Sequence, residues 1–217
     1  MAKTGGAMGT LVAATAVFLA THFVSGTPLR PALINTLGVW PYRAVYSLVA
    51  LVTLVWMAWA YLHAPHVQLW TRMPMLPYVL MPVTFILLAC GYYRNPTAVG
   101  AEKLLRSEEP ARGIIRITRH PIMWGIMLWA AAHIAARGDL KSLVFFGGFL
   151  LLAIVGTVSM DARKRENPDW PRFAAVTSHI PLVAIVQGRN RLDWREIGWL
   201  RPAIGLAAFF VVLSFHP

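Results

Sequence analysis

The sequence has few charged residues for its length of 217 residues. Charged residues make up 13% of the chain, hydrophobic residues make up 57%, and the mean hydropathy is +0.56. A soluble protein of this size cannot bury so much apolar surface. The composition therefore excludes a soluble enzyme domain, a disordered regulator and a secreted disulfide scaffold, and it predicts an integral membrane protein.

Cysteine and several common catalytic motifs are also scarce. Cys90 is the single cysteine, so an intrachain disulfide is excluded. Without a CxxCH motif, covalent attachment of a c-type haem is not expected. The sequence also lacks a P-loop, GxSxG, HExxH and GxGxxG, which excludes the enzyme classes that depend on those motifs.

Acidic residues are the third shortage. The chain has 20 Lys and Arg against 9 Asp and Glu, for a formal net charge of +11. In a soluble protein this excess would suggest nucleic-acid binding. In a membrane protein it indicates anchoring to the inner side of the bilayer, so we expect lipid rather than nucleic acid as the partner.

Long apolar runs are abundant and predict an all-α fold, a polytopic membrane helix bundle in a single domain over residues 1–217. A transmembrane helix needs about 20 mostly apolar residues, and about six segments qualify. They are approximately Ala7–Thr27, Ala44–Leu62, Met75–Tyr93, Pro121–Ala136, Leu143–Met160 and Ile197–Phe215. We expect the first to be retained rather than cleaved as a signal peptide, because it contains His22 and lacks an A-x-A exit.

The basic residues alternate between loops and predict an orientation. They concentrate in the first-to-second, third-to-fourth and fifth-to-sixth connections, and the other connections and the two tails hold few. Positively charged loops face the cytoplasm. We therefore expect a multi-pass protein of the bacterial inner membrane with both termini outside.

Two histidines are predicted to lie at one depth in the membrane, near its cytoplasmic side. His22 is close to the end of the first segment, and His120 opens the fourth. An imidazole within a membrane span needs a partner, and two imidazoles on different helices can ligate a haem iron from opposite faces. The alternative is that each ring hydrogen-bonds a neighbouring helix or a lipid headgroup.

Trp124 and several arginines accompany these histidines. Trp124 follows His120 by one helical turn and shares its face, so it would line a flat cofactor or simply pack. Arg30, Arg43, Arg116 and Arg119 are candidates for clamping haem propionates or phosphates. Their alternative role is ordinary anchoring to anionic lipid.

The other histidines and Cys90 have weaker indications. His133 is predicted to be a packing residue, and His63 with His66 to be an exposed pair, although two ligands alone can hold a metal weakly. His179 has no predicted role. Cys90 is predicted to be a small apolar filler rather than an iron ligand.

Three stretches of the chain resemble the NnrU family: His22–Pro31, Pro41–Ser47 and Ile117–Gly125, the last reading Ile-Thr-Arg-His-Pro-Ile-Met-Trp-Gly. The resemblance implies a polytopic bacterial inner-membrane protein associated with nitrite and nitric oxide metabolism. The family is similar to 15-cis-zeta-carotene isomerases, which bind haem b and use it for redox-dependent cis–trans isomerisation. It implies His22 and His120 as the haem ligands.

One departure separates the chain from those isomerases. They can use a cysteine thiolate near the Arg-His-Pro motif, whereas the stretch before His120 here is Ile115-Arg-Ile-Thr-Arg. A ligand switch that depends on a thiol is therefore not expected.

A second resemblance competes with the first. The stretch Arg119–Gly125 is similar to the RHPxYxG element of isoprenylcysteine-type membrane methyltransferases, which bind S-adenosylmethionine, and Ile180-Pro181 echoes their late cytoplasmic segment. The tyrosine of that element is Met123 here.

The sequence therefore predicts one b-type haem on His22 and His120, lined by Trp124, with Arg30, Arg43 and Arg119 at its propionates. The substrate would be a lipid-soluble polyene or a gas such as nitric oxide. A membrane methyltransferase and a non-catalytic assembly or transport factor stay open as alternatives.

Overall fold

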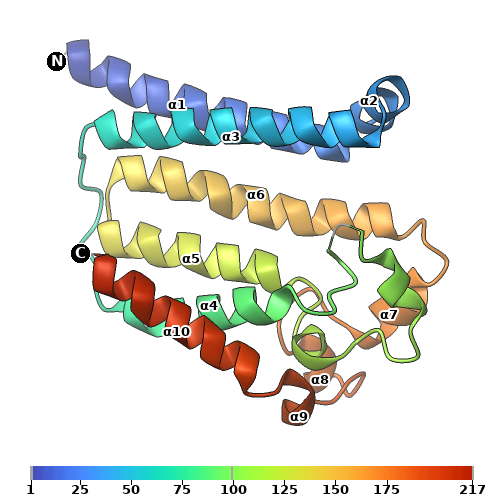
Figure 1. Ribbon diagram of the computed structural model, residues 1–217. Coiled ribbons are helices and arrows are strands. Elements are labelled where there is room, and N and C mark those ends of the chain that lie inside the picture. The colour runs from blue at the N-terminus through green and yellow to red at the C-terminus, as the bar shows by residue number, and fades with distance from the viewer. Residues whose placement is uncertain (1, 99, 217) are drawn as a thin grey trace. The chain divides into compact units, whose positions relative to one another are not determined.

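The computed structural model describes residues 2–98 and 100–216, and within those ranges helices joined by turns and loops make up the fold (Figure 1). No strand forms there, apart from an isolated antiparallel bridge between Gln68 and Asp139. The longer helices are α1 (Ala2–Phe23), α3 (Val39–His63), α4 (Leu76–Gly91), α5 (Pro121–Arg137), α6 (Leu140–Lys164) and α10 (Leu200–Phe215). Between them lie α2 (Leu29–Leu37), α7 (Trp170–Val176), α8 (Val183–Val186), α9 (Trp194–Ile197), and the 3-10 turns η1 (Val24–Gly26), η2 (Glu102–Arg106) and η3 (Gly113–Arg116).

The longer helices occupy the positions that hydropathy predicts, so the all-α class is confirmed. In the described part, α1, α3 and α6 are apolar and long enough to cross a membrane. Helices α4 and α10 are apolar but have 16 residues each, and α5 has 17. At about 1.5 Å per residue, a 16-residue helix reaches about 24 Å, short of a hydrocarbon core of about 30 Å. The orientation of the spans stays a prediction.

One helix boundary that differs from its prediction lies next to His22. The apolar run predicts a helix up to Thr27, but α1 ends at Phe23 and a 3-10 turn follows. The Ser25 hydroxyl donates to the His22 carbonyl, and Pro28 has no backbone N–H to continue the ladder. His22 therefore lies in the last turn of α1 rather than about a turn further inside, and the short helix α2 follows where a loop was expected.

The described residues group into two compact units. The first contains residues up to 74 and 133–152, and the second contains residues 75–132 and 153 onwards, so α5 and α6 each contribute to both. The core of the first unit lies between α1 and α3, where Leu11, Phe18 and Met57 are buried. The prediction of one domain over 1–217 stays a prediction.

The second unit contains two of the three connections that charge predicts to be cytoplasmic, the ones that follow α4 and α6. Its largest core cluster includes Leu105, Ile115, Trp170 and Phe173, which are all nearly inaccessible to solvent. These residues come from η2, η3 and α7, so the segments between the membrane helices are packed around apolar side chains of their own. That packing positions the loop residues described next.

Candidate functional site

Two loop segments of the second unit lie against each other and build the start of α5. The Arg119 amide donates to the Ser178 carbonyl over 3.0 Å, and the Leu182 amide donates to the Ile117 carbonyl over 2.8 Å. The Thr118 hydroxyl donates to the His179 carbonyl over 2.8 Å. These bonds bring His120, the last residue before α5, into the neighbourhood of His179.

His120 is anchored by a carboxylate from another helix. Its Nε2 lies 2.7 Å from Oδ1 of Asp161, which is near the end of α6, and the His120 side chain is 0% exposed. An ionised carboxylate only accepts hydrogen bonds, so Nε2 is the protonated nitrogen. The lone pair of a neutral ring is then on Nδ1, which is enclosed and has no hydrogen-bond partner among the described residues.

Arg119 balances the charge of the same carboxylate. Its Nη1 lies 3.2 Å from Asp161 Oδ2, and its Nη2 donates to the Thr177 carbonyl over 3.0 Å. The guanidinium carbon is 5.7 Å from the centroid of the Trp170 ring, within the range of a cation–π interaction. Burial lowers the pKa of Arg119 from its ordinary value, but an arginine stays charged in proteins. One Asp161 carboxylate therefore serves both neighbours.

His179 completes the cluster. Its ring centroid lies 5.6 Å from that of His120, and its Nε2 lies 3.5 Å from the Thr157 hydroxyl oxygen. Burial and, after it, the nearby His120 lower the pKa of His179, so the ring is neutral at neutral pH. Trp124 fixes the backbone here, because its indole N–H donates to the His179 carbonyl over 2.8 Å.

This arrangement suits metal chemistry in two ways. His120, Asp161 and His179 each offer one ligand atom, and these atoms all lie within 4.8 Å of one another, so the three side chains are placed to share one ion. Alternatively, His120 alone can ligate through Nδ1, since histidine ligands commonly donate their other ring N–H to a carboxylate. Both uses depend on Asp161.

His22, the second predicted haem ligand, belongs to the first unit. Its Nδ1 lies 2.7 Å from the Phe18 carbonyl, and its ring contacts the Phe18 ring in a tilted arrangement with 4.1 Å between centroids. The Nδ1 proton donates to that carbonyl, which leaves the lone pair on Nε2. His120 belongs to the second unit, and the pairing of the two histidines as axial ligands stays a prediction.

The predicted propionate clamps are found in different surroundings. Arg30 is exposed on α2, and Arg43 is exposed on α3 with its guanidinium 5.3 Å from the Trp40 ring centroid. Arg119 is tied to Asp161 instead of being free for an external anion. Arg116 forms a two-bonded ion pair with Glu196, at 2.7 and 2.8 Å.

The remaining histidines lie apart from this cluster in the sequence, and the structure shows local partners for them. The His133 ring is stacked on Phe146 at 4.8 Å, which agrees with a packing role. His63 places Nδ1 2.8 Å from the Trp59 carbonyl, and His66 places Nε2 3.3 Å from Asp139. Cys90 is 3% exposed, as expected of an apolar filler.

Asp161 and His179 are the functional candidates that sequence reasoning missed. Asp161 had one available signal, because a carboxylate at the end of a long apolar segment needs a partner. His179 had none, because its proximity to His120 depends on how the loop after α7 folds back.

The comparison with family models decides the relationship. The family model described as "NnrU protein" matches residues 10–217, which is nearly the whole chain. The chain belongs to the NnrU family. The resemblance stated from its motifs is therefore confirmed.

The chain is also similar to named plant proteins. This chain is 33% identical over 157 residues to 15-cis-zeta-carotene isomerase, chloroplastic, of Arabidopsis thaliana, and 32% identical over 157 residues to the protein of that name from Zea mays. Each alignment covers 70% of this chain but 40% of the relative, so the chain spans less than half the length of the curated relatives it matches. No solved structure matches the chain.

Proposed function

We propose that this NnrU protein is a membrane-embedded, isomerase-like protein that acts on a lipid-soluble polyene and binds haem b through His120 and His22. The single observation that supports this proposal best is the hydrogen bonding of the two His120 ring nitrogens. Its Nε2 is anchored to Asp161 at 2.7 Å, and its Nδ1 is buried without a partner. The similarity to zeta-carotene isomerases supports the reaction class.

The donor chemistry of His120 and His22 fits an iron ligand. Each ring has one nitrogen occupied by an oxygen acceptor, Asp161 Oδ1 for His120 and the Phe18 carbonyl for His22. The other nitrogen of each ring carries the lone pair that a metal needs. Because His120 Nδ1 is enclosed, binding a haem there requires neighbouring side chains to move apart.

The residues of the chain have distinct roles in this proposal. When bound, haem b supplies an iron that exchanges single electrons. Asp161 orients the His120 ring and holds its Nε2 proton, while Arg119 keeps Asp161 ionised. Trp124 and Thr118 both donate to the His179 carbonyl and so hold His179 beside His120.

A mononuclear metal ion is a second candidate cofactor for the same site. The observation that favours it is the clustering of His120, Asp161 and His179 within 4.8 Å. Two histidines and one carboxylate are the donor set of many non-haem iron sites.

The proposal also includes a biological setting, namely the metabolism and the membrane in which the protein acts. The link to nitrite and nitric oxide metabolism and the bacterial inner membrane stay predictions from the sequence. The apolar helices α1, α3 and α6 support a membrane location, which gives a lipid-soluble substrate direct access to the protein.

The test is an absorbance spectrum, with metal analysis, of the full-length protein purified in detergent from haem-supplemented cells. We expect a Soret band at about one haem per chain, lost in His120→Ala and in His22→Ala. Asp161→Asn should shift the band or reduce haem occupancy, because it removes the charge that orients His120. Conversion of a cis-polyene in mixed micelles, followed by chromatography, tests the activity.

His63→Ala is the matched control. His63 has a local geometry similar to that of His22, since its Nδ1 lies 2.8 Å from the carbonyl four residues earlier and its ring is tilted against the ring of that residue at 4.4 Å. It should keep the full Soret band. Bound metal without a Soret band, lost in His179→Ala, would establish the mononuclear site instead. A protein without either cofactor that binds S-adenosylmethionine would overturn the proposal in favour of a methyltransferase.

A further inference from the structure

A second feature of the second unit is a cavity of about 330 Å³ at the end of α4, walled by η3 and by the connection from α9 to α10. Four arginines are among the residues that line it, and it lies outside the His120 cluster. None of the groups predicted to bind haem lines it.

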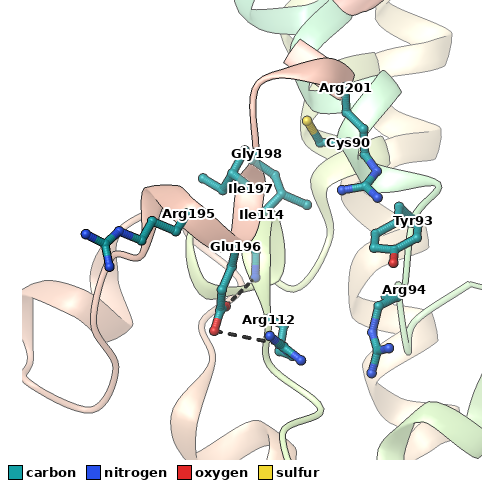
Figure 2. Close-up of a pocket in the computed structure, with 11 residues that line it drawn as sticks. Cys90, Tyr93, Arg94, Arg112, Ile114, Arg195, Glu196, Ile197, Gly198 and Arg201 are labelled. Atoms are coloured by element: carbon teal, nitrogen blue, oxygen red, sulfur yellow. Dashed lines mark hydrogen bonds and ion pairs between the residues drawn. The ribbon is translucent and has the colours of Figure 1, made fainter.

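Three guanidinium groups surround the opening of this cavity. Figure 2 shows Arg94 and Arg201 on one side, with Tyr93 between them, and Arg112 facing them from the other. The Arg201 guanidinium carbon lies 3.4 Å from the centroid of the Tyr93 ring, so stacking orients it. Arg195 also lines the cavity, but its side chain extends away beyond Glu196 (Figure 2).

The charges around the cavity are not balanced. Glu196 is the carboxylate in its wall, and it is committed to Arg116 at 2.7 and 2.8 Å and to the Gly113 amide at 2.8 Å. Arg112 lies 3.7 Å from Glu196 and 3.6 Å from Glu109, so its charge is partly balanced by two carboxylates. Within the described ranges, Arg94 and Arg201 form no ion pair. The cavity therefore presents an excess of positive charge to whatever enters it.

The backbone at Arg94 is held in an unfavourable conformation by its neighbours. Arg94 has φ of 45°, a left-handed conformation that costs a non-glycine residue free energy. Its neighbour Asn95 holds the turn through its side chain. The Asn95 Nδ2 donates to the Gly91 carbonyl over 2.9 Å, and Asn95 Oδ1 accepts from the Thr97 backbone N–H over 2.9 Å. A buried polar turn thus fixes the point from which Arg94 extends.

The surroundings of the cavity indicate a position at the membrane surface. Apolar helix α4 ends beside it and apolar helix α10 begins beside it. Tyr92 and Trp199, each next in sequence to a residue that lines the cavity, are 77% and 79% exposed. Tyrosine and tryptophan exposed at the ends of apolar helices are typical of the headgroup level of a bilayer.

We propose that this cavity binds a phosphate group, held by the guanidinium groups of Arg94, Arg201 and Arg112. Guanidinium pairs with phosphate oxygens through charge-assisted hydrogen bonds. The phosphate would come from the headgroup of an anionic lipid or from a soluble phosphate compound. The proposal does not depend on the haem.

The test measures binding to the full-length protein in zwitterionic detergent by the shift of its thermal unfolding midpoint. The probes are short-chain phosphatidic acid, inorganic pyrophosphate and, as the uncharged-headgroup comparison, short-chain phosphatidylcholine. We expect phosphatidic acid to bind the wild type, and Arg94→Gln and Arg201→Gln each to weaken its binding roughly 10- to 100-fold, the loss typical of one charge-assisted hydrogen bond. Arg195→Gln is the matched control and should bind within about twofold of the wild type.

The outcomes separate the sources of the phosphate. Binding of phosphatidic acid without pyrophosphate identifies a lipid headgroup, and binding of pyrophosphate at similar strength identifies a soluble phosphate compound. Equal binding of phosphatidylcholine and phosphatidic acid would overturn the proposal, and so would equal losses in Arg195→Gln and Arg201→Gln. The unfolding midpoint of each variant without ligand shows whether that variant is folded. If Arg94→Gln does not fold, the binding measured for Arg201→Gln decides the test.

Discussion

Asp161 shows how one carboxylate organises the residues around it. It accepts from His120 at 2.7 Å and pairs with Arg119 at 3.2 Å, while its own side chain is 16% exposed. Removing one partner of such a buried pair typically costs about 3–5 kcal/mol, because the other charge is left without compensation. The positions of the His120 and Arg119 side chains therefore both depend on Asp161.

Glu196 likewise holds several groups together, in the wall of the cavity at the end of α4. It accepts from Arg116 and from the Gly113 amide, and its side chain is 11% exposed. The hydrogen bonds from Arg116, foremost, lower the pKa of Glu196 from 4.5 to about 2. Gly113 has φ of 59°, which lets its amide approach Glu196 without a side chain in the way.

This pair predicts a pH-dependent stability. Because the folded pKa of Glu196 is about 2 and its ordinary value is 4.5, its contribution is present above pH 4.5 and is lost as the pH falls toward 2. A shift of that size corresponds to at most about 3 kcal/mol. Glu196→Gln should lower the unfolding midpoint at pH 7 and flatten its fall between pH 4.5 and pH 3.

Thermal unfolding of the detergent-solubilised protein at several pH values measures this effect. The exposed Glu108→Gln is the control, and it should keep the pH profile of the wild type. An unchanged slope in Glu196→Gln would show that another carboxylate is responsible.

At the scale of elements, glycine lets apolar helices approach closely. A Cβ on Gly205 of α10 would lie 2.7 Å from the Phe85 carbonyl oxygen of α4 and 3.0 Å from the Ile86 Cα. These atoms belong to the backbone and cannot rotate away. Small residues at such crossings are a common feature of membrane helix pairs.

Gly205→Ala should therefore separate α4 from α10 and destabilise the second unit by about 1–3 kcal/mol. The matched control is Gly147→Ala in α6, where a Cβ would meet nothing within 4 Å. That variant should be neutral or slightly stabilising, because alanine is the better helix former. Unfolding midpoints in detergent measure both, and equal midpoints for the two variants would contradict the packing argument.

At the scale of the whole molecule, the distribution of basic loops predicts the orientation. The loops after α1, α4 and α6 contain most of the arginines and lysines, and these loops are expected to face the cytoplasm. Residues of those loops line the cavity at the end of α4 and contribute to the His120 cluster.

Labelling of intact cells with a membrane-impermeant maleimide tests this orientation. Met73→Cys, 54% exposed after α3, should be labelled, whereas Arg191→Cys, exposed in the loop before α9, should be labelled only after the cells are opened. Cys90 is 3% exposed, so the natural background is low. The opposite pattern would reverse the predicted topology.

Sequence reasoning predicted the helices better than the site. Hydropathy over a window of about 20 residues placed all the longer helices, because a membrane imposes that length. It missed helix α2 and extended α1 too far, because the Ser25–Pro28 turn depends on local hydrogen bonds rather than hydropathy. It identified His120, Trp124 and Arg119 but missed Asp161 and His179 as their partners.

The amino-acid sequence by itself determined that this protein is helical, apolar and built for a membrane, since shortage of charge and length of apolar runs are local properties. Its motifs also determined the family. Only the tertiary structure decided which polar groups meet: Asp161 reaches His120 across 41 residues, and Glu196 reaches Arg116 across 80. Such contacts depend on how the loops fold back over their own apolar core, and no window along the chain contains that information.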